Sequence, residues 1–249
     1  MNLLAHDESP PVLIERADAA SPFVITCDHA GKRLPRSLGD LGVNASERER
    51  HIAWDIGALG VAQALARALD GVLIAQRYSR LVIDCNRPPD SADLICTRSE
   101  NTDIPGNCDL APSARAARIE SIYAPYHAAI STLLDARVRR PTIYIAVHSF
   151  TPVYAGVARP WQVGVLYGAD TRLARPLLAA LRAPDDLMVG DNEPYRIDDK
   201  DHGIPTHALA RGLPHVLLEI RQDLITAADD QAHWGACLAA VLTSASQAL

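Results

Sequence analysis

Aromatic residues make up only 5% of this chain of 249 residues, and its five cysteines form no C-x-x-C pair. Cysteines that are odd in number and widely spaced are typical of reduced, buried thiols rather than of a disulfide framework. The sequence also has neither a G-x-S-x-G nucleophile elbow nor a Walker phosphate-binding loop. These absences argue against serine-hydrolase and P-loop chemistry.

The chain also lacks an excess of positive charge, because 24 Lys and Arg residues face 30 Asp and Glu residues for a net charge of −6. A mildly acidic chain without a basic stripe is a poor binder of nucleic acid or of an anionic membrane. No apolar run reaches the roughly 18 residues of a membrane helix, and the first residues show no basic-then-apolar signal pattern. We therefore expect a cytoplasmic protein without a nucleic-acid or membrane partner, its oligomeric state left open.

What the chain does contain is a regular alternation of apolar runs and helical patterns. Strands are predicted at 22–27, 72–76, 80–85, 142–147, 161–167 and 215–220, and helices at 46–70, 113–138, 170–183, 204–211 and 229–247. This alternation predicts a three-layer α/β/α sandwich with a mixed, largely parallel sheet. Because no linker divides the sequence, we expect one domain over residues 1–249, with 1–20 as a loosely attached arm. Residues 90–111 are predicted to form a long polar loop.

Polar and ionisable residues follow four of the predicted strands. They are Asp28 with His29, Asp84 with Asn86 and Arg87, His148, and Glu219. In open α/β sheets, ligands bind beyond the carboxyl ends of the strands, so parallel strands would bring these groups to one site. Four such strand ends in a chain of this size favour a catalytic centre.

His29 and His148 are the natural pair of metal ligands in this set. Neutral imidazole suits zinc, and a catalytic zinc takes three protein ligands and a water molecule. The third ligand is sought on the helix predicted over 46–70, where His51 and Asp55 share one face. We favour Asp55, with His51 as the alternative, and we expect Zn²⁺ with another divalent metal as the alternative. Taken singly, each histidine also fits a hydrogen-bonded core residue.

Glu219 lies inside an apolar strand, where an unpaired carboxylate is costly to bury. A nearby metal or a raised pKa would suit a general base that activates water, and the alternative is a structural ion pair. Arg80, Asn86 and Arg87 bracket another predicted strand, and a guanidinium fork matches a substrate carboxylate as well as it matches Asp84. Further candidates for substrate contacts, with a plain turn or surface position as the alternative, are Asn192, Tyr195 and His207.

Several segments of the chain resemble the N-formylglutamate amidohydrolase family. They are residues 27–31 with 34–35, 51–57, 78–88, 147–149 and 218–223. The resemblance implies an α/β/α fold of the phosphorylase/hydrolase kind, similar to zinc carboxypeptidases and aspartoacylase. It also implies hydrolysis of an N-formyl or N-acyl amino acid, such as N-formyl-L-glutamate, to the free amino acid and formate.

The same resemblance implies roles for individual residues. The positions that match metal-binding residues are His29, Asp55 and His148. Glu219 matches the catalytic carboxylate, and the substrate-binding positions are Arg80, Asn86 and Arg87. Glu219 would take the proton of a metal-activated water and pass it to the leaving amine, while an arginine such as Arg80 stabilises the oxyanion. Two alternatives remain open: a hydrolase of a different N-acyl amino acid or small peptide, and a non-catalytic protein that binds small carboxylates.

Overall fold

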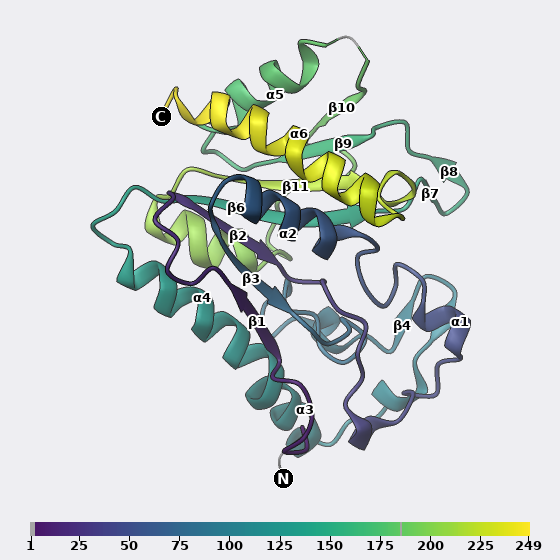
Figure 1. The fold of residues 1–249 in the computed structure, drawn as a ribbon. Helices are drawn as coiled ribbons and strands as arrows, with labels where there is room; N and C mark the ends of the chain where they lie inside the picture. Colours follow the sequence, from purple (N-terminus) through teal and green to yellow (C-terminus); the bar gives the residue numbers. More distant parts are fainter. Residues whose placement is uncertain (1–2, 185) are drawn as a thin grey trace.

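A seven-stranded mixed sheet forms the centre of the computed structural model, which describes residues 3–184 and 186–249 (Figure 1). Its four central strands are parallel to one another, the β9 strand is antiparallel to β11, and one edge strand, β1, is antiparallel to β3. In spatial order the strands are β1 (Val12–Glu15), β3 (Val72–Gln76), β2 (Phe23–Cys27), β6 (Ile143–Phe150), β11 (His215–Arg221), β9 (Val163–Leu166) and β10 (Val189–Asp191). The predicted mixed, largely parallel sheet is confirmed.

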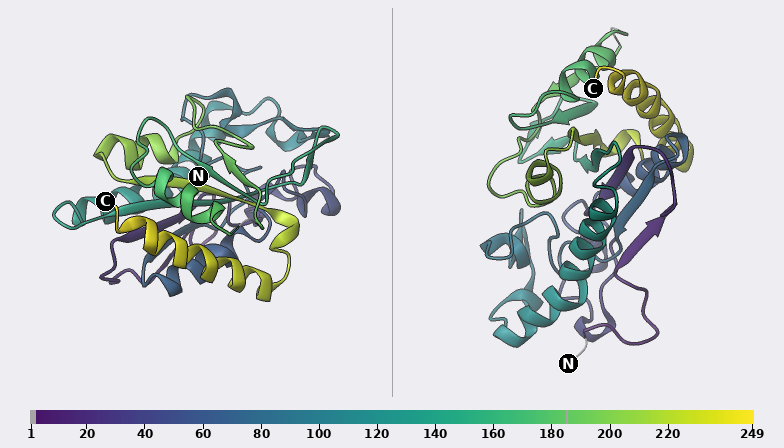
Figure 2. Two further views of the ribbon diagram at one scale, coloured as in Figure 1. Left: turned by 90° about the horizontal axis from the view of Figure 1, so that it is seen from above. Right: turned by 90° about the vertical axis from the view of Figure 1, so that its left-hand side faces the viewer.

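Helices cover both faces of this sheet (Figures 1 and 2). One face packs against α2 (Ala58–Ala68), α5 (Ala174–Arg182) and α6 (Ala228–Ser246). The other face packs against α4 (Ala124–Ala136), which continues from α3 (Pro112–Arg118) through a π-helical turn at Ile119–Tyr123, just before Pro125. The architecture is therefore the expected three-layer α/β/α sandwich. None of the described helices is both long and apolar enough to cross a membrane.

The alternation of side chains along the strands decides which face carries the polar groups. In β6, Ile145 and Val147 belong to the core under α2 and α6, whereas Tyr144 and Ala146 belong to the core under α4. Because successive strand residues point to opposite faces, His148 points to the α4 side. Strand β2 is buried along its whole length and β6 likewise, which explains why both appear as continuous apolar runs in the sequence.

The single helix predicted over 46–70 is wrong, because this region forms two helices separated by turns. The first, α1 (Ala45–Arg48), is capped by Asn44, since the Asn44 side chain accepts a hydrogen bond from the Glu47 N–H at 2.9 Å. The second, α2, begins only after Gly57, whose φ of 78° is incompatible with a continuous helix. Residues 49–57 are therefore turns, and no helix face joins His51 to Asp55.

The strand predicted at 80–85 is also wrong, because this segment is a buried loop. Leu81, Val82 and Ile83 are fully buried, and a short buried apolar run looks the same in a sequence whether it is a strand or not. The backbone instead forms turns and loop contacts, in which the Val82 N–H donates to the Ser79 carbonyl at 2.9 Å. We call residues 79–87 the buried loop.

Two segments that were expected to be irregular contain short regular elements. Residues 12–15, inside the arm expected to be loosely attached, pair with β3 as the edge strand β1. The long loop at 90–111 contains short 3₁₀ turns at Ala92–Ile95 and Pro105–Asn107 and a hairpin of β4 (Arg98–Ser99) and β5 (Thr102–Asp103). Both segments are therefore held by backbone hydrogen bonds.

A close backbone approach at Gly31 fixes the turn that follows β2. A Cβ atom at this position would lie 1.9 Å from the Arg77 carbonyl oxygen, and a backbone atom cannot move aside as a flexible side chain does. We expect Gly31→Ala to cost at least the ~1–3 kcal/mol of ordinary overpacking, measured as a lower urea midpoint of unfolding. The matched control is Gly168→Ala, because no described atom lies within 4 Å of a Cβ there. Equal midpoints for the two variants would contradict the close approach.

Candidate metal and catalytic centre

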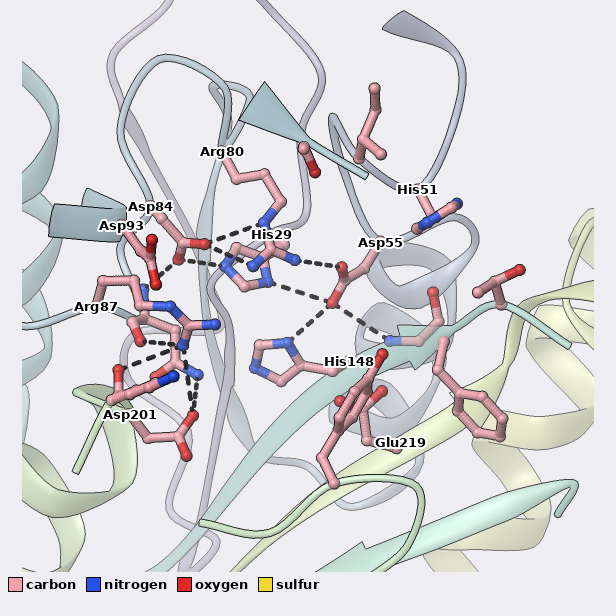
Figure 3. Close-up of a pocket in the computed structure, with 18 of the residues that line it drawn as sticks. His29, His51, Asp55, Arg80, Asp84, Arg87, Asp93, His148, Asp201 and Glu219 are labelled. Carbon is pink, nitrogen blue, oxygen red and sulfur yellow. Dashed lines mark hydrogen bonds and ion pairs between the residues drawn. The ribbon is translucent and has the colours of Figure 1, made fainter. Parts of the chain in front are cut away.

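A cavity of about 540 Å³ lies where β2, β6 and β11 reach their carboxyl ends. Figure 3 shows His29, Asp55 and His148 pointing toward one another in it, with Arg80 and Glu219 on either side. The parallel register places Glu219 opposite His148 on neighbouring strands. Three of the four polar strand ends therefore meet as expected, and the fourth group reaches the same cavity from the buried loop.

Each histidine of this centre faces a carboxylate at both ring nitrogens. His29 Nε2 lies 2.7 Å from Asp84 Oδ1, and His29 Nδ1 lies 3.4 Å from Asp55 Oδ2. His148 Nδ1 lies 2.8 Å from the same Asp55 oxygen, and His148 Nε2 lies 3.3 Å from Asp28 Oδ2. All five side chains are buried, and Asp55 Oδ2 and the two Nδ1 atoms form a compact group.

These residues could hold a metal ion. Ligand atoms of His29, Asp55 and His148 all lie within 4.8 Å of one another, and the buried His29 Nδ1 makes no hydrogen bond within the described part of the chain. A histidine that binds a metal usually has its other ring nitrogen held by a carboxylate, which is what Asp84 and Asp28 do here. Two imidazoles and a carboxylate are a ligand set that suits zinc. The donor chemistry therefore fits a divalent metal.

His51, the alternative third ligand, lies at the edge of the cavity rather than in this group. Its Nε2 is 3.2 Å from Glu100 Oε1, in the loop between β4 and β5. Asp55 is drawn to the centre instead by its own backbone, because the Asp55 N–H donates to the His29 carbonyl at 2.9 Å directly after β2. The geometry favours Asp55 through a loop contact, not through the shared helix face that the sequence suggested.

Burial and neighbouring charge set the protonation of the centre. Burial raises the pKa of Glu219 to about 8, and its Oε2 has no hydrogen-bond partner among the described residues. Burial alone would also raise the pKa of Asp55, but His29 and His148 hold that pKa well below its usual range. A carboxyl group that titrates near neutral pH beside a firmly ionised one suits proton transfer.

The raised pKa of Glu219 predicts a pH-dependent cost to folding in metal-free protein. Between its usual value of 4.5 and the folded value of about 8, the folded state binds more protons than the unfolded state, so stability falls as pH rises. Glu219→Gln removes this cost. We expect the variant's free energy of unfolding to rise relative to wild type from pH 5 to pH 8, by up to ~1.4 kcal/mol per pH unit. Urea unfolding with a chelator present measures the free energy of unfolding of both proteins at each pH. If the variant and the wild type differ by the same amount at every pH, the raised pKa of Glu219 is contradicted.

Arg80 is anchored to the carboxylates of the centre. Its Nε donates to Asp84 Oδ2 at 3.0 Å, and its Nη1 lies 3.6 Å from Asp55 Oδ1. The guanidinium still borders the cavity, with its side chain one quarter exposed. Arg80 therefore supplies a fixed positive charge beside the two histidines, and the pairing with Asp84 that the sequence left open is present.

Arg87 and Asn86 line the same cavity beside Lys200 and Asp201, and we call this part of the cavity its charged end. Arg87 Nη1 donates to the Lys200 carbonyl at 3.3 Å and lies 3.9 Å from Asp201 Oδ1. The Asn86 amide donates to Asp201 Oδ1 at 2.9 Å and accepts from the Gly203 N–H at 2.9 Å. Asn86 thus fastens the segment around Asp201 to the buried loop, whereas the loosely held Arg87 guanidinium remains available to a ligand.

The structure does not bring Asn192 and His207, both expected to contact substrate, to the cavity. Asn192 Oδ1 accepts the Tyr167 N–H at 2.9 Å and so holds a turn after β10. His207 is fully buried, with its Nε2 2.8 Å from His127 Nδ1 beneath α4. Their polar atoms serve the fold. Tyr195, in contrast, lines the cavity as expected.

Sequence reasoning missed the part played by Asp28 and Tyr126. Asp28 is 2% exposed, and each of its carboxylate oxygens has a partner. Oδ1 accepts a hydrogen bond from the Tyr126 hydroxyl, and Oδ2 faces His148 Nε2. Tyr126 comes from α4, nearly one hundred residues away in the sequence, so no local pattern links them. The available signal was the acid directly before His29 at the end of a buried strand.

Fold and site together define the class: a three-layer α/β/α protein with a buried histidine–carboxylate centre at the carboxyl ends of its strands. A model of the N-formylglutamate amidohydrolase family matches residues 21–226. The chain therefore belongs to the N-formylglutamate amidohydrolase family.

Individual relatives agree with this family. The N-formylglutamate deformylase of Pseudomonas putida is 33% identical over 166 residues, which cover 60% of this chain and 61% of the relative's length. The crystal structure of a gene product from Agrobacterium tumefaciens has a TM-score of 0.95 and 38% identity, over 99% of this chain and 98% of that one. An N-formylglutamate amidohydrolase from Ralstonia eutropha has a TM-score of 0.68 and 18% identity, over 97% and 100% of the two chains, and so shares the fold.

Proposed function

We propose that the protein is a metal-dependent amidohydrolase that releases an amino acid from its N-formyl or N-acyl derivative. The observation that carries this proposal is the meeting of His29, Asp55 and His148 beside the buried Glu219 in one cavity. Membership of the family supports the reaction class, and the Pseudomonas putida relative is named for deformylation of N-formylglutamate. The partner is then a small N-acyl amino acid, and the expected compartment is the cytoplasm.

His29 Nδ1, His148 Nδ1 and an Asp55 oxygen would hold zinc, with another divalent ion as the alternative. A bound zinc ion supplies a Lewis acid that polarises the amide carbonyl and lowers the pKa of water. Asp84 and Asp28 keep the opposite nitrogens of the two rings engaged, so that both Nδ1 atoms face Asp55. These two carboxylates position the two histidine ligands.

Glu219 is the residue that moves the proton. Its carboxylate accepts a proton from the attacking water and delivers it to the nitrogen of the leaving amine as the C–N bond breaks. Arg80, fixed between Asp84 and Asp55, places positive charge where the carbonyl oxygen becomes negative. Arg87, at the other end of the cavity, offers its guanidinium to the carboxylate of the amino acid.

Metal analysis of untagged protein followed by a substrate panel tests the proposal. About one zinc per chain, together with turnover of at least one N-formyl, N-acetyl or N-succinyl amino acid, would support it. The opposite result is a protein that binds no zinc and does not hydrolyse N-acyl amino acids, but is stabilised against heat by them. That result would replace the proposed amidohydrolase function with the binding of small carboxylates.

Asp28→Asn should weaken zinc binding by about 10- to 100-fold, because an outer carboxylate fixes the ring orientation of its histidine and makes it a stronger ligand. Competition with a chromophoric chelator measures the affinity directly, without reference to turnover. The matched control is Asp191→Asn, since Asp191 is exposed and contacts the Tyr167 hydroxyl. If both variants bind zinc as tightly as wild type, Asp28 does not position His148.

A further inference from the structure

One wall of the cavity is aromatic, and the mechanism above does not use it. Phe150, Tyr154 and Tyr195 all line the cavity. Phe150 ends β6, Tyr154 belongs to the β7 strand (Val153–Tyr154) of a small hairpin, and Tyr195 follows β10. We call these three side chains the aromatic wall. In a chain with few aromatic residues, three of them border one site.

Arg159 holds the aromatic wall together. Its guanidinium carbon lies 4.7 Å from the ring centres of both Tyr154 and Tyr195 and 5.8 Å from that of Phe150. It also donates a hydrogen bond to the Tyr195 hydroxyl at 2.8 Å. Arg159 is not among the residues that line the cavity, and its guanidinium lies over the three rings. Contacts with one guanidinium therefore join the three rings into a single cluster.

The aromatic wall begins on the Glu219 side of the centre. Phe150 follows His148 by two residues in β6, so both point to the same face, and Glu219 is the register partner of His148. Arg87 and Asp201 lie on the opposite side of His29 and His148, as Figure 3 shows. The cavity thus has a charged end, a histidine–carboxylate centre and an aromatic end in sequence.

This order fixes how an N-acyl amino acid can lie in the cavity. The scissile amide has to sit at the centre, within reach of Glu219, and the amino-acid carboxylate has to lie toward Arg87. The acyl group then extends toward the aromatic wall. A formyl group carries only a hydrogen beyond its carbonyl and would leave the rings uncovered, whereas a larger apolar acyl group would bury them. A volume of about 540 Å³ also falls among pockets for larger ligands.

We infer that the protein prefers an N-acyl amino acid with an aromatic acyl group over the N-formyl derivative, with Phe150, Tyr154 and Tyr195 as the acyl-binding residues. This inference rests on the proposed function and names its substrate class. In the reaction, water adds to the carbonyl carbon, the C–N bond breaks, and Glu219 passes the proton to the departing nitrogen. The products are an aromatic carboxylate and a free amino acid, so no further reactant is needed.

The test compares kcat/KM for the N-formyl, N-acetyl and N-benzoyl derivatives of one amino acid on the zinc-loaded enzyme. We expect the benzoyl derivative to be preferred over the formyl derivative by at least about tenfold, since a single methylene in an apolar pocket can contribute that much discrimination. A preference for the formyl derivative overturns the inference but leaves the proposed function standing. Hydrolysis of none of the three, with zinc bound, counts against the proposed function itself.

Two variants tie the preference to the aromatic wall. Tyr195→Ala should lower the ratio of benzoyl to formyl kcat/KM by at least about tenfold, because it removes one ring from the acyl end. Tyr167→Ala is the matched control, because it removes the same side chain at a position that lies outside the cavity and contacts Asp191. Zinc content and the thermal midpoint check that each variant is folded. A ratio unchanged in Tyr195→Ala, or lowered equally in both variants, overturns the assignment.

Discussion

Replacing Glu219 by Gln is expected to lower kcat by about 10²- to 10⁴-fold while the zinc content stays at the wild-type level. The amide keeps the volume of the carboxyl group but cannot accept the proton of the attacking water. Glu219 is not among the three residues whose ligand atoms cluster, so its loss should leave the metal in place. Turnover under saturating substrate and metal analysis of the same preparation measure the two effects.

The control for Glu219→Gln is Asp223→Asn, four residues further along the chain. Asp223 is exposed and pairs with Arg221, so its neutralisation changes charge near the end of the same strand without entering the cavity. A Glu219→Gln enzyme with near-normal kcat would remove Glu219 from the mechanism. Loss of zinc together with activity would instead make Glu219 a metal ligand.

Asp55→Asn is expected to abolish both zinc binding and turnover, with zinc affinity lowered by at least about 100-fold. Asp55 is the only charged ligand of the proposed set, and its Oδ2 faces both His29 Nδ1 and His148 Nδ1. The isosteric amide keeps the shape of the side chain but removes the negative charge that a divalent cation requires. Chelator competition measures the affinity, and the wild-type enzyme stripped of metal and reloaded with zinc gives the activity reference.

His51→Gln is the informative comparison for Asp55→Asn. His51 lies beside Glu100 at the edge of the cavity, so its replacement should leave zinc affinity within about twofold of wild type. The reverse pattern, with zinc lost in His51→Gln and retained in Asp55→Asn, would transfer the third ligand to His51. Equal loss in both would show that the segment between α1 and α2 acts as a unit.

Much of the fold could be predicted because the central strands are buried on both faces. Strands β2, β3, β6 and β11 each appear as one apolar run in the sequence. The same reasoning failed at residues 80–85 for the same physical reason, since burial alone makes a run apolar. The helix predicted over 46–70 is split at Gly57, which has a positive φ. The tertiary fold sets this backbone conformation, and helix propensity does not reveal it.

The candidate site could be predicted in part because parallel strands end together. His29, His148 and Glu219 were identifiable from their places at the ends of apolar runs. The link from Tyr126 through Asp28 to His148 joins three segments that are distant in sequence, and no spacing rule reveals it. Asn192 and His207 lie outside the cavity, and their hydrogen bonds are made within the fold, which the sequence could not distinguish from contacts with a ligand.

The buried loop ties the candidate site to the hydrophobic core. Arg80 and Asp84 stand on either side of Leu81, Val82 and Ile83, whose side chains are packed with 0% exposure. In a surface loop Arg80 and Asp84 would be mobile, whereas a loop buried in the core holds both at fixed distances from His29. Trimming one methyl group from Leu81 or Ile83 would thus loosen the centre without touching a catalytic atom. Substitutions of these three apolar residues are therefore expected to affect the positions of Arg80 and Asp84 as well as the stability of the fold.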